Sequence, residues 1–158
     1  MAFLEVLGIM YKTEFEKRNL VIATNLAQEE IELVRNIRDN NWKLGCTAFN
    51  IEKKAGCREI PDGTFYLDYQ MTQAISCAPG NDVATLYRIK ASGFYTYTAS
   101  DGGVENSKTK FRRYFSVSGD SNNNSKKITV FVVWRPSGAS SDAKVEMEDT
   151  LYAWTNPQ

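Results

Sequence analysis

The chain divides into two parts that differ in how apolar and polar residues alternate. From Phe3 to Asn40 there is no proline and one glycine, and most residues are good helix formers. At about 1.5 Å per residue, this segment forms a rod about 55–60 Å long. With successive residues about 100° apart, the apolar residues of its second half share one arc of roughly 180°. They are Leu20, Ile22, Ala23, Leu26, Ala27, Ile31, Leu33, Val34 and Ile37. An arc this wide predicts a helix lying flat on a sheet, because coiled coils use a narrower seam.

Two charged residues interrupt this arc, Glu30 near its centre and Arg38 at its edge. A carboxylate within an apolar stripe lies either at the rim of the sheet or beside a cation. We expect rim exposure for Glu30. A catalytic role is not expected, because no acid or base partner for Glu30 can be named.

The first half of the rod has a different pattern. Its apolar residues cover all sides of the helix: Phe3, Leu4, Val6, Leu7, Ile9, Met10 and Tyr11. Such a segment needs burial all round, by lipid or by neighbouring subunits. The apolar stretch Ala2–Met10 is about half as long as a membrane span. We therefore interpret it as the end of a longer apolar helix.

After Trp42 the chain consists of short aromatic and β-branched runs separated by turn-forming residues. The spacing predicts an antiparallel meander of three strands, Lys108–Ser118, Lys127–Arg135 and Lys144–Trp154. The middle strand is apolar on both faces, which is typical of a central strand. The fold class is therefore α+β: a long N-terminal helix (1–42) packed on a mainly antiparallel sheet domain (43–158), forming one structural unit.

The amino-acid composition argues against several classes of function. The chain has 158 residues, enough for one domain with a hydrophobic core. It has 19 basic and 19 acidic residues, which argues against a general nucleic-acid or anionic-membrane surface. It has no histidine, which removes imidazole-based triads and most zinc sites. We expect neither an enzyme nor a cofactor.

The three cysteines, Cys46, Cys57 and Cys77, form no C-x-x-C pair, so metal binding is not expected. They fit either one disulfide with a free thiol in an oxidising compartment, or three reduced thiols. Spacing does not choose between the pairs. Cys57 with Cys77 is the candidate pair for a disulfide.

The segment "RNLVIATNLAQEEIELVRNIRDNNW", residues 18–42, closely resembles type IV pilin-like proteins, which carry a prepilin-type N-terminal methylation helix. Minor pilins and type II secretion pseudopilins of the V/I type share an "A-x-x-x-A-Q-E-x-I-E-x-x-R-x-x-R-D" stretch. Here its positions are filled by Ala23, Ala27, Gln28, Glu29, Ile31, Glu32, Arg35, Arg38 and Asp39. Downstream, "TKFRRYFSV" and "KKITVFVVW" are also similar to that family.

The resemblance implies a structural subunit of a type IV pilus or type II secretion-like filament. Such a subunit is extracytoplasmic, anchored in the membrane before assembly and then part of a cell-surface or periplasmic filament. Its partners are other pilin or pseudopilin subunits, the inner-membrane assembly machinery, and the membrane through a preceding apolar segment. The residues assigned to helix packing and assembly are Leu20, Ala23, Ala27, Ile31, Val34 and Trp42. We expect Asn40 or Asn41 to end the helix in the left-handed conformation, with Trp42 folding back.

Three other interpretations remain open. The chain could be a stand-alone extracytoplasmic adhesion or binding module, with tyrosines and asparagine-rich loops as its contact surface. The loops "SDGGVENS" and "SGDSNNNS" favour hairpin turns over a calcium site. In "KTKFRR", residues 108–113, Lys108, Lys110 and Arg112 alternate as on a solvated strand face, so nucleic-acid contact is not expected.

Overall fold

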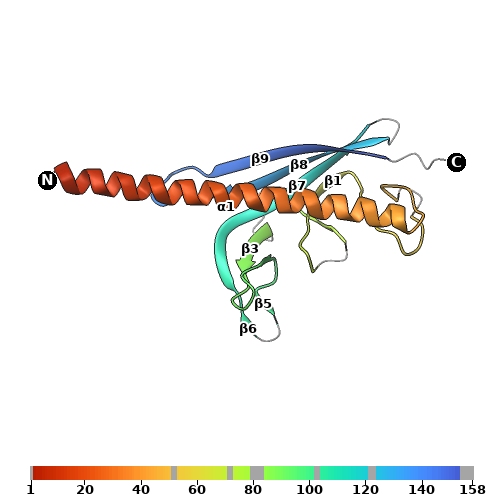
Figure 1. The fold of residues 1–158 in the computed structure, drawn as a ribbon, viewed down its shortest axis with the longest axis horizontal. Coiled ribbons are helices and arrows are strands. Elements are labelled where there is room, and N and C mark those ends of the chain that lie inside the picture. Colours follow the sequence, from red (N-terminus) through yellow and green to blue (C-terminus); the bar gives the residue numbers. More distant parts are fainter. Residues whose placement is uncertain are drawn as a thin grey trace.

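A single long helix and a curled antiparallel sheet make up the fold (Figure 1). The structure is a computed structural model, which describes residues 2–50, 53–70, 73–78, 84–101, 104–120 and 124–153. Helix α1 (Ala2–Lys43) has 42 residues, and the sheet lies along its C-terminal part. The predicted α+β class, with one N-terminal helix and a mainly antiparallel sheet, is confirmed.

The main sheet has seven strands, all paired antiparallel. They are β1 (Gly63–Tyr66), β2 (Ile75–Ser76), β3 (Thr85–Arg88), β4 (Tyr95–Thr96), β7 (Ser107–Gly119), β8 (Ser125–Trp134) and β9 (Ala143–Tyr152). One path runs β2-β1-β7-β3-β4, while β8 lies between β7 and β9. Strands β5 (Ser100–Asp101) and β6 (Val104–Glu105) form a separate hairpin.

The predicted meander is confirmed as β7, β8 and β9. Its middle strand is central, and Ile128, Val130 and Val132 are fully buried on its core face. Phe131 on the opposite face is half-buried. Apolar side chains on both faces of β8 are therefore at least partly buried, as is typical of a central strand.

Strand β7 is shared between two parts of the sheet. Pairing between β7 and β8 ends at Arg112 opposite Val133, whereas residues 107–112 pair with β3 on the other edge. The first part of β7 therefore bends away from β8 (Figure 1). A groove lined by residues of β7, such as Lys108 and Arg112, and by Arg135 and Asp142 of the connection from β8 to β9 lies beside this bend.

Helix α1 packs on the sheet through its C-terminal half. Ala23 and Ala27 are completely buried, and Val34 is 1% exposed, in a core that includes Phe115 and Val130. The small alanine side chains let the helix backbone approach the strands closely. Burial of the larger apolar side chains supplies the main stabilising free energy of this interface.

The C-terminus of α1 differs from the sequence prediction. The helix continues through Asn40 and Asn41, and Gly45 adopts the left-handed conformation with φ of 69°. Cys46 N donates to Asn41 O (2.9 Å) and Gly45 N donates to Trp42 O (2.9 Å), which is a Schellman motif. The left-handed position falls on glycine because glycine carries no Cβ penalty there.

Candidate functional site

The predicted assembly face of α1 separates into buried and exposed residues. Ala23, Ala27, Ile31 and Val34 lie in the core against the sheet. Leu20 and Trp42 are each 51% exposed, so the expectation that Trp42 folds back is wrong. Trp42 points away because its neighbour Asn41, 1% exposed, occupies the inward position at the end of the helix.

Asn41 holds the segment that follows α1. Its Nδ2 donates to the carbonyl oxygens of Ala48 (3.1 Å) and Arg58 (2.6 Å), and its Oδ1 accepts from Arg58 N (2.8 Å). One buried amide therefore satisfies three backbone groups, which fixes this segment against the end of the helix.

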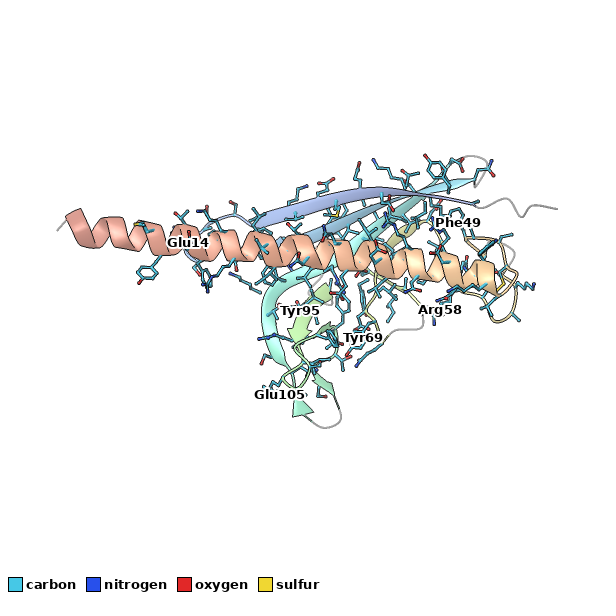
Figure 2. The ribbon with its side chains drawn as sticks, viewed as in Figure 1. Glu14, Phe49, Arg58, Tyr69, Tyr95 and Glu105 are labelled. Atoms are coloured by element: carbon cyan, nitrogen blue, oxygen red, sulfur yellow. A yellow bond between two sulfur atoms is a disulfide. The ribbon has the colours of Figure 1, made fainter. Side chains whose placement is uncertain are left out.

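The first half of α1 carries an exposed apolar surface, which we define as Met10, Tyr11, Phe15, Leu20 and Val21. These side chains are between 50% and 76% exposed. Beyond Glu14, labelled in Figure 2, the helix continues past the sheet toward its N-terminus. Large exposed apolar side chains gathered along one segment of a helix are typical of an interaction surface.

A groove lies where the exposed apolar surface meets the sheet. It has a volume of about 520 Å³ and lies between α1 and the ends of β8 and β9. Its lining residues are Lys12, Thr13, Glu16, Lys17 and Leu20 of α1, together with Trp134 and Ala143. Trp134 Nε1 donates to Glu16 Oε2 at 3.4 Å, which keeps the indole against the helix. The helix and the sheet thus both contribute side chains to this groove.

Glu30 is fully buried, so the expectation that it lies at the exposed rim is wrong. Its Oε2 lies 2.8 Å from Nε of Arg113, which is also fully buried. Its Oε1 accepts a hydrogen bond from Leu67 N at 3.1 Å. Of the two expectations for a carboxylate in the apolar arc, the structure therefore has the second, in which the carboxylate lies beside a cation.

Arg113 joins four parts of the chain. Its Nη1 donates to Leu26 O in α1 (3.2 Å), and its Nη2 donates to Leu67 O, just after β1 (3.2 Å). Its Nε donates to the Tyr97 hydroxyl, which follows β4 (3.1 Å). Arg113 itself lies on β7, so one guanidinium connects the helix to three places in the sheet. We call Glu30, Arg113 and Tyr97 the buried clamp.

Burial and neighbouring charges together set the pKa values of the clamp residues. Burial raises the pKa of Glu30 to about 7, although the positive charge of Arg113 acts to lower it. Burial lowers the pKa of Arg113, yet the Glu30 carboxylate, Tyr97 and Glu29 together hold that pKa above its ordinary value. Burial also raises the pKa of Tyr97 well above its ordinary value. Because Glu30 and Arg113 are sealed from solvent and Tyr97 is half-buried, the role of these side chains is to position helix and sheet.

The cysteine pairing also differs from the candidate pair. Cys46 and Cys57 form a disulfide with a Cα–Cα distance of 6.5 Å, and Cys77 is a half-buried free thiol. Between the two cysteines, Asn50 Nδ2 donates to Cys57 O and Asn50 Oδ1 accepts from Lys54 N, so Asn50 is held close to Lys54 and Cys57. Cys77 instead follows β2, where its N–H donates to Thr64 O. A disulfide is consistent with an oxidising, extracellular location.

Comparison with known proteins finds no matching protein family, no matching curated protein and no matching solved structure. Within the described residues, no helix is both long enough and apolar enough to span a membrane. The described part of the chain also contains no group of three or more His, Cys, Asp or Glu side chains placed to hold a metal ion.

Proposed function

We propose that this chain is a structural subunit, a minor pilin or pseudopilin of a type IV pilus or type II secretion-like filament. One observation carries the proposal. The same helix is buried against its sheet over one half, at Ala23 and Ala27, and presents exposed apolar side chains over the other half, at Tyr11 and Val21. A helix with this division supports its own domain and contacts neighbouring subunits.

The division suggests an assembly mechanism. The exposed apolar surface packs among the helices of other subunits, and the sheet is displayed outward. The buried clamp fixes the sheet on the helix, so that each subunit presents the same surface to its neighbours. The partners in this proposal are other pilin-like subunits, the inner-membrane assembly machinery, and the membrane through an apolar segment preceding Ala2.

A second candidate is a stand-alone extracytoplasmic adhesion or binding module. It is favoured by Tyr69 and Phe94, which are 46% and 61% exposed, with ring centroids 5.5 Å apart. Tyr69 and Tyr95 lie on the side of the sheet near the small β5–β6 hairpin (Figure 2). Exposed neighbouring aromatic rings are common in surfaces that bind sugars or peptides.

Mass spectrometry of the N-terminus distinguishes the two candidates, using the gene product isolated from the cells that make it. A cleaved, N-methylated start followed by about 20 further apolar residues, enough to span a bilayer, supports the filament subunit. A native protein that starts at Met1 contradicts the filament proposal and favours the binding module.

A further inference from the structure

A second groove, distinct from the groove beside Leu20, lies where β7 leaves β8. It has a volume of about 330 Å³ and lies between the first part of β7 and the connection from β8 to β9. The residues that line it are all polar or charged: Thr85, Lys108, Thr109, Lys110, Arg112, Arg135 and Asp142. We call this the basic groove.

The basic groove concentrates positive charge in a chain with no net charge. It contains four cationic side chains and one carboxylate, Asp142, among the described residues that line it, so four minus one leaves a local charge of +3. Asp142 is shared, because Arg112 Nη2 lies 2.6 Å from its Oδ2 and Arg135 Nε lies 2.8 Å from its Oδ1. The carboxylate therefore orients the two guanidinium groups without neutralising the groove.

The cations are arranged in a row. Lys108, Lys110 and Arg112 alternate along β7, so successive members are about 6.6 Å apart along the strand. The Lys110 ammonium lies 4.5 Å from the ring centroid of Phe15, which holds it beside α1. A row of regularly spaced cations matches a linear ligand with regularly spaced negative groups better than it matches a single ion.

An aromatic pair continues this row. Tyr114 lies two residues beyond Arg112 on the same strand, and it stacks on Phe131 with ring centroids 5.1 Å apart. The Lys144 ammonium lies 5.7 Å from the centroid of Phe131. Cations that follow a strand beside half-buried aromatic rings are the elements with which proteins hold a single-stranded nucleic acid.

A second copy of this chain is a poorer occupant. The acidic residues on the outer side of β9 already have cationic partners in their own molecule, Glu146 with Lys144 and Glu148 with Lys127, each at 2.7 Å. These pairs leave little free negative charge there to complement the basic groove. Because every residue that lines the groove is polar or charged, it also suits a hydrophilic ligand.

We propose that the basic groove binds a linear phosphate polyanion, with Lys108, Lys110, Arg112 and Arg135 contacting its phosphate groups. Arginine forks match the geometry of phosphate oxygens, and lysines supply mobile point charges. This inference stands on the groove alone and does not depend on the filament assignment.

The test measures binding of two probes by fluorescence anisotropy over a range of salt concentrations. The probes are a labelled single-stranded DNA oligonucleotide and labelled inorganic polyphosphate. Lys108→Gln with Lys110→Gln should weaken binding of both about tenfold. For the oligonucleotide it should also lower the slope of log affinity against log salt by about 1.4, about 0.7 for each phosphate that is no longer neutralised. Lys110→Arg, which keeps the charge, should retain affinity.

The matched control is Lys53→Gln with Lys127→Gln, which removes the same charge outside the groove and should change neither affinity nor slope. A further variant, Tyr114→Leu, identifies the source of the phosphate. Weaker binding of DNA alone indicates a nucleic acid, because polyphosphate has no bases to stack. Unchanged binding of both probes indicates contacts to the phosphate chain only.

Three results would overturn the proposal. One is the absence of binding of both probes at low salt. Another is an equal loss of affinity in the control variant, which would mean that the response follows total charge. The third is equal binding of heparin with the same dependence on Lys108 and Lys110, which would show no preference for phosphate. Circular dichroism of each variant confirms that the fold is intact.

Discussion

Arg113 and Glu30 show how one pair of residues can fix the relation between a helix and a sheet. Removing two charges from water is costly, and the attraction between them repays this cost only where other hydrogen-bond partners are also present. Here the guanidinium also reaches the carbonyl oxygens of Leu26 and Leu67 and the hydroxyl of Tyr97. Each partner comes from a different place in the fold, so the pair forms only when helix and sheet are correctly aligned.

Removing one member of the pair should therefore be far more damaging than removing both. We expect Arg113→Met to lower the free energy of unfolding by about 3–5 kcal/mol, because it leaves the Glu30 carboxylate buried without a cation. Combining Arg113→Met with Glu30→Leu should cost clearly less than Arg113→Met alone, because no charge is then left buried without its partner. Urea denaturation of the four proteins measures this as a double-mutant cycle. Additive losses would mean that the two side chains act independently.

The titration of Glu30 gives a second test at the residue scale. Its pKa rises from an ordinary value of 4.5 to about 7 in the folded protein. Because the folded state holds this proton more tightly, the associated stability is fully present below the unfolded pKa of 4.5 and is lost as pH rises to about 7.

Relative to Glu30→Gln, which does not titrate, the wild-type protein should lose free energy of unfolding across this pH range. Urea denaturation of both proteins at each pH isolates the contribution, because Asp142 and Glu148, whose pKa values are lowered by Arg135 and Lys127, are common to both. If the wild-type protein instead gained free energy of unfolding relative to Glu30→Gln as pH rises, attraction to Arg113 would outweigh burial.

Part of the clamp could be predicted from the sequence. Strict alternation along residues 108–118 places Arg113 on the same face as Phe111 and Phe115, the face that is buried. Glu30 stands at the centre of the apolar arc of the helix. Two charges in two apolar stripes are a signal for a buried pair, but the cation-rich run from Lys108 to Arg112 suggested a solvated strand. The position of Tyr97 beside Arg113 could not be predicted, because it depends on the tertiary fold and not on the local sequence pattern.

At the scale of elements, the C-terminus of α1 shows where local rules suffice and where they do not. An Asn-Asn-Trp sequence suggested the end of the helix, whereas the Schellman motif formed beyond it, at Gly45. The side chain of Asn41 is buried, because it donates hydrogen bonds to the carbonyl oxygens of Ala48 and Arg58. Tertiary hydrogen bonds therefore decided which residue took the left-handed position.

The disulfide Cys46–Cys57 closes the segment that follows this helix end, with a sequence separation of 11. Removing it with Cys46→Ser and Cys57→Ser should lower the free energy of unfolding by about 2–3 kcal/mol, because a loop of this length gains entropy in the unfolded chain. Cys77→Ser should cost clearly less, since it closes no loop. Chemical denaturation of the three proteins gives these values.

Thiol alkylation under denaturing conditions provides an independent check on the pairing. One of the three cysteines should react before reduction and all three afterwards, and peptide mapping should place the first label on Cys77. A label on Cys46 would contradict the pairing. It would restore Cys57 with Cys77 as the alternative.

The strands repeat this contrast between local and distant pairing. The meander β7-β8-β9 was predicted because its turns are short and its strands pair with their neighbours in sequence. The pairing of β1 and β3 with one edge of β7 was not predicted, since these partners are separated by long, irregular segments. The bend of β7 that creates the basic groove follows from that distant pairing.

At the scale of the whole molecule, helix α1 divides into two parts. Its C-terminal half completes the core of its own domain, whereas its N-terminal half carries exposed apolar side chains, which in the proposed filament would contact other subunits. This division makes a clear prediction, because folding and assembly should respond to substitutions at different positions on one helix. Val21 and Ala27, 59% and 0% exposed, represent the two surfaces.

We expect Val21→Lys to change the free energy of unfolding by less than about 0.5 kcal/mol, as is usual for an exposed position. It should nevertheless reduce the amount of the subunit in filaments sheared from cells that express the complete gene, since a lysine there must be desolvated between helices. Ala27→Lys is the contrasting variant, and it should unfold the domain by placing a large charged side chain in a filled core. Normal incorporation of the Val21→Lys subunit would show that this part of the helix is not an assembly surface, and the binding-module interpretation would then be preferred.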